Sequence, residues 1–216
     1  MKYKESRYLI LCLLFFFCTK NPKTGTSYFP LIPGKEWVYT LTVLDWEEGE
    51  VDTVETGQLI LSLGEKVSFE GKELYPVTAM MIFPTAKRMR VLSDTFSATF
   101  YWEENEGFIG QYRTLGAQLD TFLLLPLEKD KEWRFSSLWT FLIRDDPHYY
   151  IARSEGKDTV RVGQEKFSDA QKIRYWGEEI EGTFYLVKEY GVVKWDDREG
   201  EEGSFTEYIF EWQREE

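Results

Sequence analysis

Hydrophobic and polar residues alternate with a period of two along most of the chain. This alternation, interrupted by glycine-containing turns, indicates β-strands with one buried face. The runs 59–63, 100–102 and 108–109 fit it, while 121–127 and 136–143 remain ambiguous between strand and short helix. The clearest hydrophobic faces belong to the first and last strands: Trp37, Tyr39, Leu41 and Val43; Thr206, Tyr208, Phe210 and Trp212. No long amphipathic period of 3.6 residues occurs, so the pattern predicts an all-β protein.

Two sequence patterns occur twice, in the same order. Pro30-Leu31 followed by Lys35-Glu36-Trp37 recurs as Pro126-Leu127 followed by Lys131-Glu132-Trp133. A Thr-Phe-Tyr triplet begins eight residues before Gly107 and again eight residues before Gly191. Such ordered repetition predicts duplicated structural units.

The repeats define the expected architecture. We predict one all-β domain over 28–216, an antiparallel barrel or strongly curved sheet of two similar halves, 28–120 and 121–216. Trp37 and Trp133 should then be structurally equivalent. The alternative is a two-sheet β-sandwich with unrelated halves.

The first 18 residues have the order of a targeting segment. Lys2, Lys4 and Arg7 precede the apolar run 8–17, which is shorter than the about 20 residues that a membrane-spanning helix needs. We predict a lipoprotein-type signal peptide over 1–18 and a polar linker over 19–27. Cys18, at their junction, is the predicted lipid-attachment residue, whereas Cys12 lies inside the apolar run. Secretion without lipid and an uncleaved anchor are the alternatives.

Charge narrows the range of partners. The chain has 216 residues, 26 Lys and Arg, 38 Asp and Glu, and a net charge of -12, which becomes -14 without residues 1–18. Such an acidic chain disfavours nucleic acid and anionic lipid headgroups as partners. Membrane attachment should therefore come from acyl chains at Cys18. The content of 43% hydrophobic and 17% aromatic residues excludes intrinsic disorder.

A family resemblance rests on the start of the predicted domain. The run Tyr28-Phe29-Pro30-Leu31-x-x-Gly34-x-x-Trp37-x-Tyr39, directly after a lipoprotein-like signal, resembles the opening of a broad group of uncharacterised bacterial lipoproteins. Residues 160–173 (VRVGQEKFSDAQKI) and Gly191-Val192-Val193-Lys194 resemble strands that follow in that group. The resemblance implies a secreted β domain on the cell envelope and implies no catalytic residue.

Side chains with catalytic or metal-binding chemistry are few. No nucleotide-binding glycine loop, nucleophile elbow, HExxH or CxxC motif occurs. His148 could act as a base beside Asp145 and Asp146, but an exposed Asp-Pro turn explains it better. The acidic cluster 196–203 fits a solvated hairpin tip better than a calcium loop. The basic patch 87–90 fits the guarding of an edge strand better than an anionic partner. We predict no catalytic residue, no metal site and no cofactor.

These observations favour an exported, lipid-anchored envelope protein that acts as a non-catalytic structural or interaction module. The alternative is a carrier for a lipid or other apolar ligand in a barrel cavity lined by Trp and Tyr. A hydrolase is less favoured. Most of the eight tryptophans should fill the core, and exposed ones would stack on carbohydrate or lipid. Asn21 and Asn105 are the only asparagines, and with abundant charged residues this resembles proteins from hot environments.

Overall fold

The structure, a computed structural model, describes residues 28–83, 95–136, 149–178, 180–201 and 204–214. Over these residues the chain forms β-strands and no helix, so none of the described segments is a helix that could cross a membrane. The predicted all-β class is confirmed. The strands in chain order are β1 (Glu36–Glu47), β2 (Glu50–Leu63), β3 (Val67–Phe69), β4 (Lys72–Ile82), β5 (Thr95–Glu104), β6 (Phe108–Tyr112), β7 (Asp120–Leu124), β8 (Glu132–Phe135), β9 (Tyr150–Val162), β10 (Glu165–Trp176), β11 (Ile180–Val187), β12 (Gly191–Glu201) and β13 (Ser204–Trp212).

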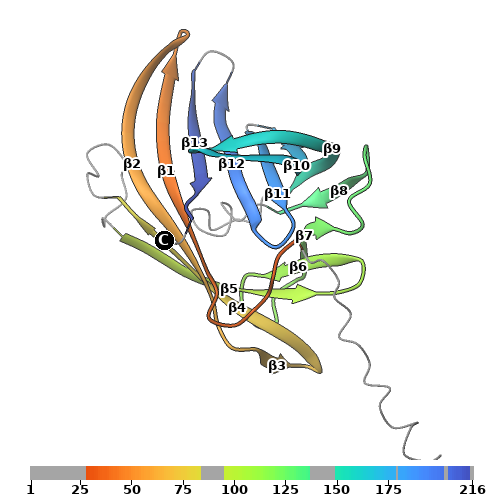
Figure 1. The fold of residues 1–216 in the computed structure, drawn as a ribbon. Helices are drawn as coiled ribbons and strands as arrows, with labels where there is room; N and C mark the ends of the chain where they lie inside the picture. The colour runs from red at the N-terminus through yellow and green to blue at the C-terminus, as the bar shows by residue number, and fades with distance from the viewer. Residues whose placement is uncertain (1–27, 84–94, 137–148, 179, 202–203, 215–216) are drawn as a thin grey trace, which may run out of the picture.

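All strand pairs are antiparallel, and the sheet follows the order β7-β6-β5-β4-β2-β1-β13-β12-β11-β10-β9-β8, with β3 paired to β4 alone (Figure 1). Each half of this order is an up-and-down meander of six strands. The two meanders join where β1 pairs with β13 in a ladder of nine residue pairs, from Tyr39 opposite Trp212 to Glu47 opposite Ser204.

The two outer strands of the sheet, β7 and β8, also meet. The backbone N–H of Ser136, just after β8, donates to the carbonyl oxygen of Thr121 in β7 at 3.3 Å. The buried Gln111 side chain of β6 donates to the carbonyl oxygen of Ser136 at 2.6 Å. The sheet is therefore nearly closed into a barrel, with a continuous ladder at one join and a few contacts at the other.

The predicted similarity of the two halves is visible in their hydrogen bonds. Gly34 and Asp130 both have positive φ angles, 82° and 65°. Their N–H groups donate to the carbonyl oxygens of Leu63 and Ser154, each at 2.7 Å. Trp37 then lies opposite Leu61, and Trp133 lies opposite Ala152, at the same distance along their strands from those bonds. Trp37 and Trp133 are thus equivalent, as predicted.

The second repeated pattern corresponds only in part. Phe100 of β5 and Phe184 of β11 are both buried on the inner face. The glycines that follow differ, because Gly191 has a φ of 87° whereas Gly107 has no positive φ. The two hairpins consequently turn in different ways, and the equal spacing of the glycines does not reflect equal structure.

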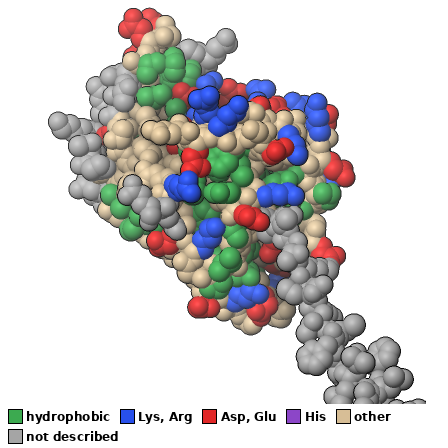
Figure 2. Space-filling model, in the orientation of Figure 1, with side chains coloured by type: hydrophobic (Ala, Val, Ile, Leu, Met, Phe, Trp, Pro, Cys, Tyr) green, Lys and Arg blue, Asp and Glu red, His purple; other side chains and the backbone are tan. Residues whose placement is uncertain are grey.

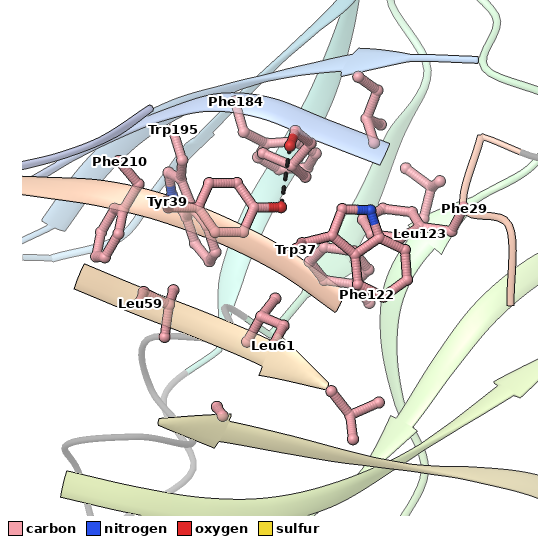
Figure 3. Packing of buried hydrophobic residues seen from close by; sticks show 14 of the residues in the cluster. Phe29, Trp37, Tyr39, Leu59, Leu61, Phe122, Leu123, Phe184, Trp195 and Phe210 are labelled. Atoms are coloured by element: carbon pink, nitrogen blue, oxygen red, sulfur yellow. Dashed lines mark hydrogen bonds between the residues drawn. The ribbon is translucent and has the colours of Figure 1, made fainter. Parts of the chain in front are cut away.

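Aromatic rings fill the described interior of the barrel (Figure 3). Phe29, which precedes β1, lies at one end, with its ring 5.1 Å from that of Trp102 and 5.7 Å from that of Trp37. Farther along, the rings of Phe122 and Phe184 stack at 5.9 Å. Inward-pointing large side chains of this kind stabilise a sheet that curves around them. The start of the Tyr28–Tyr39 motif thus closes one end of the barrel.

Candidate functional site

The hairpin of β9 and β10 extends beyond the barrel and forms an arm, residues 155–172. Its bend coincides with Gly156, which has a φ of 91°, and with register shifts in the β9–β10 pairing. Val160, Val162 and Ala170 of the arm cover Val193 on the outer face of β12 and form a second hydrophobic cluster. Figure 1 shows β9 and β10 crossing β12, with the hairpin end toward β13. In the first half the corresponding segment, 64–76, is shorter, so the arm is a main difference between the halves.

Three rings gather where the arm meets the end of β13. The ring centroid of Tyr190 lies 5.3 Å from that of Trp212 and 5.5 Å from that of Phe167. Phe167 and Trp212 lie 6.4 Å apart, and all three pairs are edge-to-face. Tyr190 is 40% exposed, and the other two rings are half-buried. A cluster of partly exposed rings on an outer surface is a feature of binding sites.

Two hollows adjoin at Trp212 and Arg214, which line both, and we call them together the Trp212 groove. Their volumes are about 340 and 320 Å³. The first hollow is lined by Lys35, Glu36, Trp37, Glu189, Tyr190, Trp212 and Arg214. The second is lined by Thr40, Val162, Gly163, Gln164, Glu165, Glu211, Trp212, Gln213 and Arg214.

The turn that contains Tyr190 is held in place by hydrogen bonds from Lys35 and Trp37, at the start of β1. The indole N–H of Trp37 donates to the carbonyl oxygen of Tyr190 at 2.7 Å, and Lys35 Nζ donates to that of Glu189 at 3.3 Å. Glycine is required at position 191, because a Cβ there would lie 3.1 Å from both Phe29 and Trp37 and the φ is 87°. The repeated Lys-Glu-Trp motif therefore positions one wall of the groove.

Charges of both signs surround the groove. Arg214 Nη1 lies 2.9 Å from Glu165 Oε1, which ties the end of β13 to the tip of the arm. Lys35 Nζ lies 5.4 Å from the ring centroid of Trp37, and Glu36 accepts a hydrogen bond from Ser62 at 2.7 Å. Figure 2 shows acidic, basic and hydrophobic side chains interspersed over the face that it presents. The groove thus offers ring faces beside hydrogen-bond donors and acceptors.

A third hollow, of about 260 Å³, lies over β10, β11 and β12 and is lined mainly by charged side chains. These pair with one another: Lys172 with Glu155 at 3.0 Å and Arg174 with Glu181 at 3.1 Å. Burial raises the pKa of Asp196 in the same hollow, and Lys194 counteracts the rise. Because its charges compensate each other, we interpret this hollow as a network of surface ion pairs.

Several residues singled out in the sequence lie outside the described part of the chain: Cys12, Cys18, His148 and the basic patch 87–90. The acidic cluster 196–203 is described up to residue 201. Its interpretation as a solvated hairpin tip is wrong for Asp196 and Asp197, because both lie within β12. Asp197 is only 2% exposed, and its charge contributes to a raised pKa of the buried Tyr175, whose main cause is burial. Among the described residues, no three His, Cys, Asp or Glu side chains gather as metal ligands.

The structure gives no support to a ligand cavity inside the described barrel, because rings occupy that space. Phe135 and Tyr175 lie 4.8 Å apart, and Phe184 and Trp195 lie 6.1 Å apart. The alternation predicts that Trp212 points inward with Tyr208 and Phe210. Trp212 is instead only half-buried at the end of β13, where it packs against both the barrel core and the second hydrophobic cluster. Because Trp212 continues the alternation of β13, the sequence pattern assigns it to the core and does not reveal the groove. The sequence feature that could have indicated the groove is the polar pair Gln213-Arg214 directly after this tryptophan.

Comparison with known proteins gives only distant likenesses. No family model matches the chain, and no curated protein matches its sequence. A protein from Bacteroides fragilis, assigned as exported and with a YmcC-like fold, is 11% identical with a TM-score of 0.47. A protein from Parabacteroides distasonis, assigned as a lipoprotein, is 10% identical with a TM-score of 0.42. Each alignment covers 86% of this chain and 98% of the other.

Proposed function

We propose that this protein is an exported, non-catalytic binding module of the cell envelope. In this proposal acyl chains on Cys18 hold it on the membrane, and the Trp212 groove contacts its partner. The observation that carries the second part is the arm. It departs from the repeated architecture, and where its tip meets β13 it builds a groove of partly exposed rings.

The composition of the groove supports binding rather than catalysis. Its rings and charged side chains suit recognition, since Trp, Tyr and Arg are the residue types most enriched among residues that dominate binding energy. Arg214 is positioned by its ion pair with Glu165, and Lys35 by its hydrogen bond to the carbonyl oxygen of Glu189. Neither contact places a nucleophile beside a base. The carrier alternative has less support, because the described interior of the barrel is filled by rings.

Two measurements on the full chain test the two parts. Metabolic labelling with a fatty acid should label the wild type and not Cys18→Ala; equal labelling would contradict the anchor. For the groove, the full-length protein in detergent micelles should sediment with detergent-washed envelope fragments of the source cells, and Trp212→Ala should lower the bound fraction. Trp46→Ala is the matched control, because it removes a half-buried tryptophan at the opposite end of β1. Equal binding of all three proteins would contradict a role for the groove.

A further inference from the structure

We infer that the partner of the Trp212 groove is a neutral carbohydrate chain. This inference rests on the proposed function and adds the chemical class of the ligand. A sugar ring carries C–H groups on its faces and hydroxyl groups around its edge. It therefore binds where an aromatic face lies beside hydrogen-bonding side chains of mixed character, and the groove has both.

The three rings have aromatic faces that neighbouring protein groups cover only in part, so these faces can stack on a ligand. In an edge-to-face pair, one ring directs its edge at a face of the other, so each such contact covers only one face of one ring. Tyr190, Trp212 and Phe167 are arranged in this way, and Tyr190 is 40% exposed. The negative face of an aromatic ring attracts the C–H groups of a sugar through the ring quadrupole.

The rim provides donors and acceptors together, as hydroxyl groups require. Arg214 uses one nitrogen for Glu165 and retains further N–H donors, because a guanidinium has five. Glu36 and Glu189 supply acceptor oxygens on the other side of Trp212. An acyl chain in this place would remove these charged groups from water without offering them hydrogen bonds in exchange, which is costly. An anionic polymer would meet three glutamates, Glu36, Glu165 and Glu189, on a chain with a net charge of -12.

The form of the groove favours a chain over a single sugar. The two hollows of about 340 and 320 Å³ adjoin at Trp212, so one sugar unit on each side would contact the same indole. A peptide is the competing partner, because it can also contact rings and charged side chains, and the proteinase treatment distinguishes the two.

The test uses the same full-length protein, in a detergent without a sugar headgroup, and the same washed envelope fragments. One portion of fragments is oxidised with periodate, which cleaves vicinal diols of sugars, and another is digested with proteinase. We expect periodate to abolish the Trp212-dependent binding and proteinase to leave it intact. Trp212→Ala should weaken binding about tenfold or more, and Tyr190→Ala should weaken it too, as for residues that dominate an interface.

The outcomes separate this inference from the proposed function. Loss of binding after proteinase but not after periodate would overturn the carbohydrate and leave a protein partner for the groove. Binding that resists both treatments would also overturn it. Binding unaffected by either groove variant would overturn the groove itself. Should Trp212→Ala unfold, Tyr190→Ala decides alone, because this ring lies in a turn outside the barrel.

Discussion

Trp37 and Trp133 occupy the same position in the two halves of the barrel, yet their indole N–H groups differ in hydrogen bonding. Trp37 Nε1 donates to the carbonyl oxygen of Tyr190 at 2.7 Å. Trp133 Nε1 is buried and has no acceptor among the described residues. The Lys-Glu-Trp motif therefore positions a wall of the Trp212 groove in the first half, whereas in the second half its tryptophan only packs in the core.

This difference predicts unequal costs for one substitution. Trp37→Phe should lower the free energy of unfolding by about 1–3 kcal/mol more than Trp133→Phe, because it leaves the Tyr190 carbonyl oxygen without its donor. The loss of ring volume is the same in both variants. Urea unfolding followed by circular dichroism measures the two values, and equal destabilisation would contradict the assigned role of the hydrogen bond.

Gly182 of β11 predicts a steric effect. A Cβ at this position would lie 2.2 Å from the ring of Tyr175, which is fully buried. Tyr175 cannot move freely, because it accepts a hydrogen bond from Trp195 Nε1 at 2.6 Å. Gly182→Ala should therefore lower the free energy of unfolding by about 1–3 kcal/mol, the usual cost of overpacking.

Gly107→Ala is the matched control, because a Cβ there meets nothing within 4 Å and the residue has no positive φ. Its unfolding midpoint should equal that of the wild type or exceed it. A Gly182→Ala midpoint as high as that of the control would show that the β11 backbone can shift to accommodate the methyl group.

The alternation of residues predicted most of the barrel, since it identifies which face of a strand is buried. It failed at Trp212, because this residue at the end of β13 is only half-buried and contacts the arm as well as the barrel core. It could also have identified Asp197, which shares its face with the buried Trp195. The many charged residues in the cluster 196–203 favoured a solvated hairpin tip instead. The bend of the arm at Gly156 depends on a backbone conformation that period-two alternation does not encode.

Asp196 predicts a dependence of stability on pH. Because burial raises its pKa in the folded protein, this carboxyl group binds its proton more tightly in the folded state than in the unfolded state. Its contribution therefore favours the folded state at low pH and is lost as the pH rises through the folded pKa. Asp196→Asn should raise the melting temperature at pH 7, with a gain that disappears below about pH 4.

Asp169→Asn is the control for this measurement. It removes the same charge from a side chain that is 80% exposed. Both variants relieve the general repulsion of an acidic protein. The control also removes an ion pair with Lys157 at 3.0 Å, which contributes little to stability because both side chains are exposed, so the change of the difference with pH reports the effect of burial. Parallel melting curves of the two variants from pH 4 to pH 7 would contradict the prediction.

Two arginines on the outer face predict different costs. Arg198 Nε pairs at 2.9 Å with Glu207, whose side chain is 9% exposed, whereas Arg174 pairs at 3.1 Å with the half-exposed Glu181. Arg198→Gln should destabilise by about 1–3 kcal/mol, because a buried carboxylate loses its counter-charge while keeping its bond from Trp46. Arg174→Gln should cost less than about 1 kcal/mol. Chemical denaturation compares them, and a reversed order would contradict the assignment.

The scarcity of asparagine and the ion pairs across β9 to β13 lead to a prediction about heat. We expect the wild type to melt above the range of about 45–65 °C that is usual for proteins of moderate environments. Ion-pair networks are a common feature of heat-resistant proteins, because the desolvation penalty of charges falls with temperature. Differential scanning calorimetry gives the value, and melting within that range would contradict the prediction.

The ladder between β1 and β13 has a consequence for how the chain folds. It joins residues near the beginning of the described chain to residues near its end, with Tyr39 opposite Trp212. The other strand pairs join strands that are close together in the chain, so this ladder should form late, because a long loop must close before its contacts form. Until β13 arrives, the edge of β1 remains available to other strands, which is the usual origin of aggregation. A chain in which β1 is available before β13 should therefore depend on a chaperone until its last strand has been released.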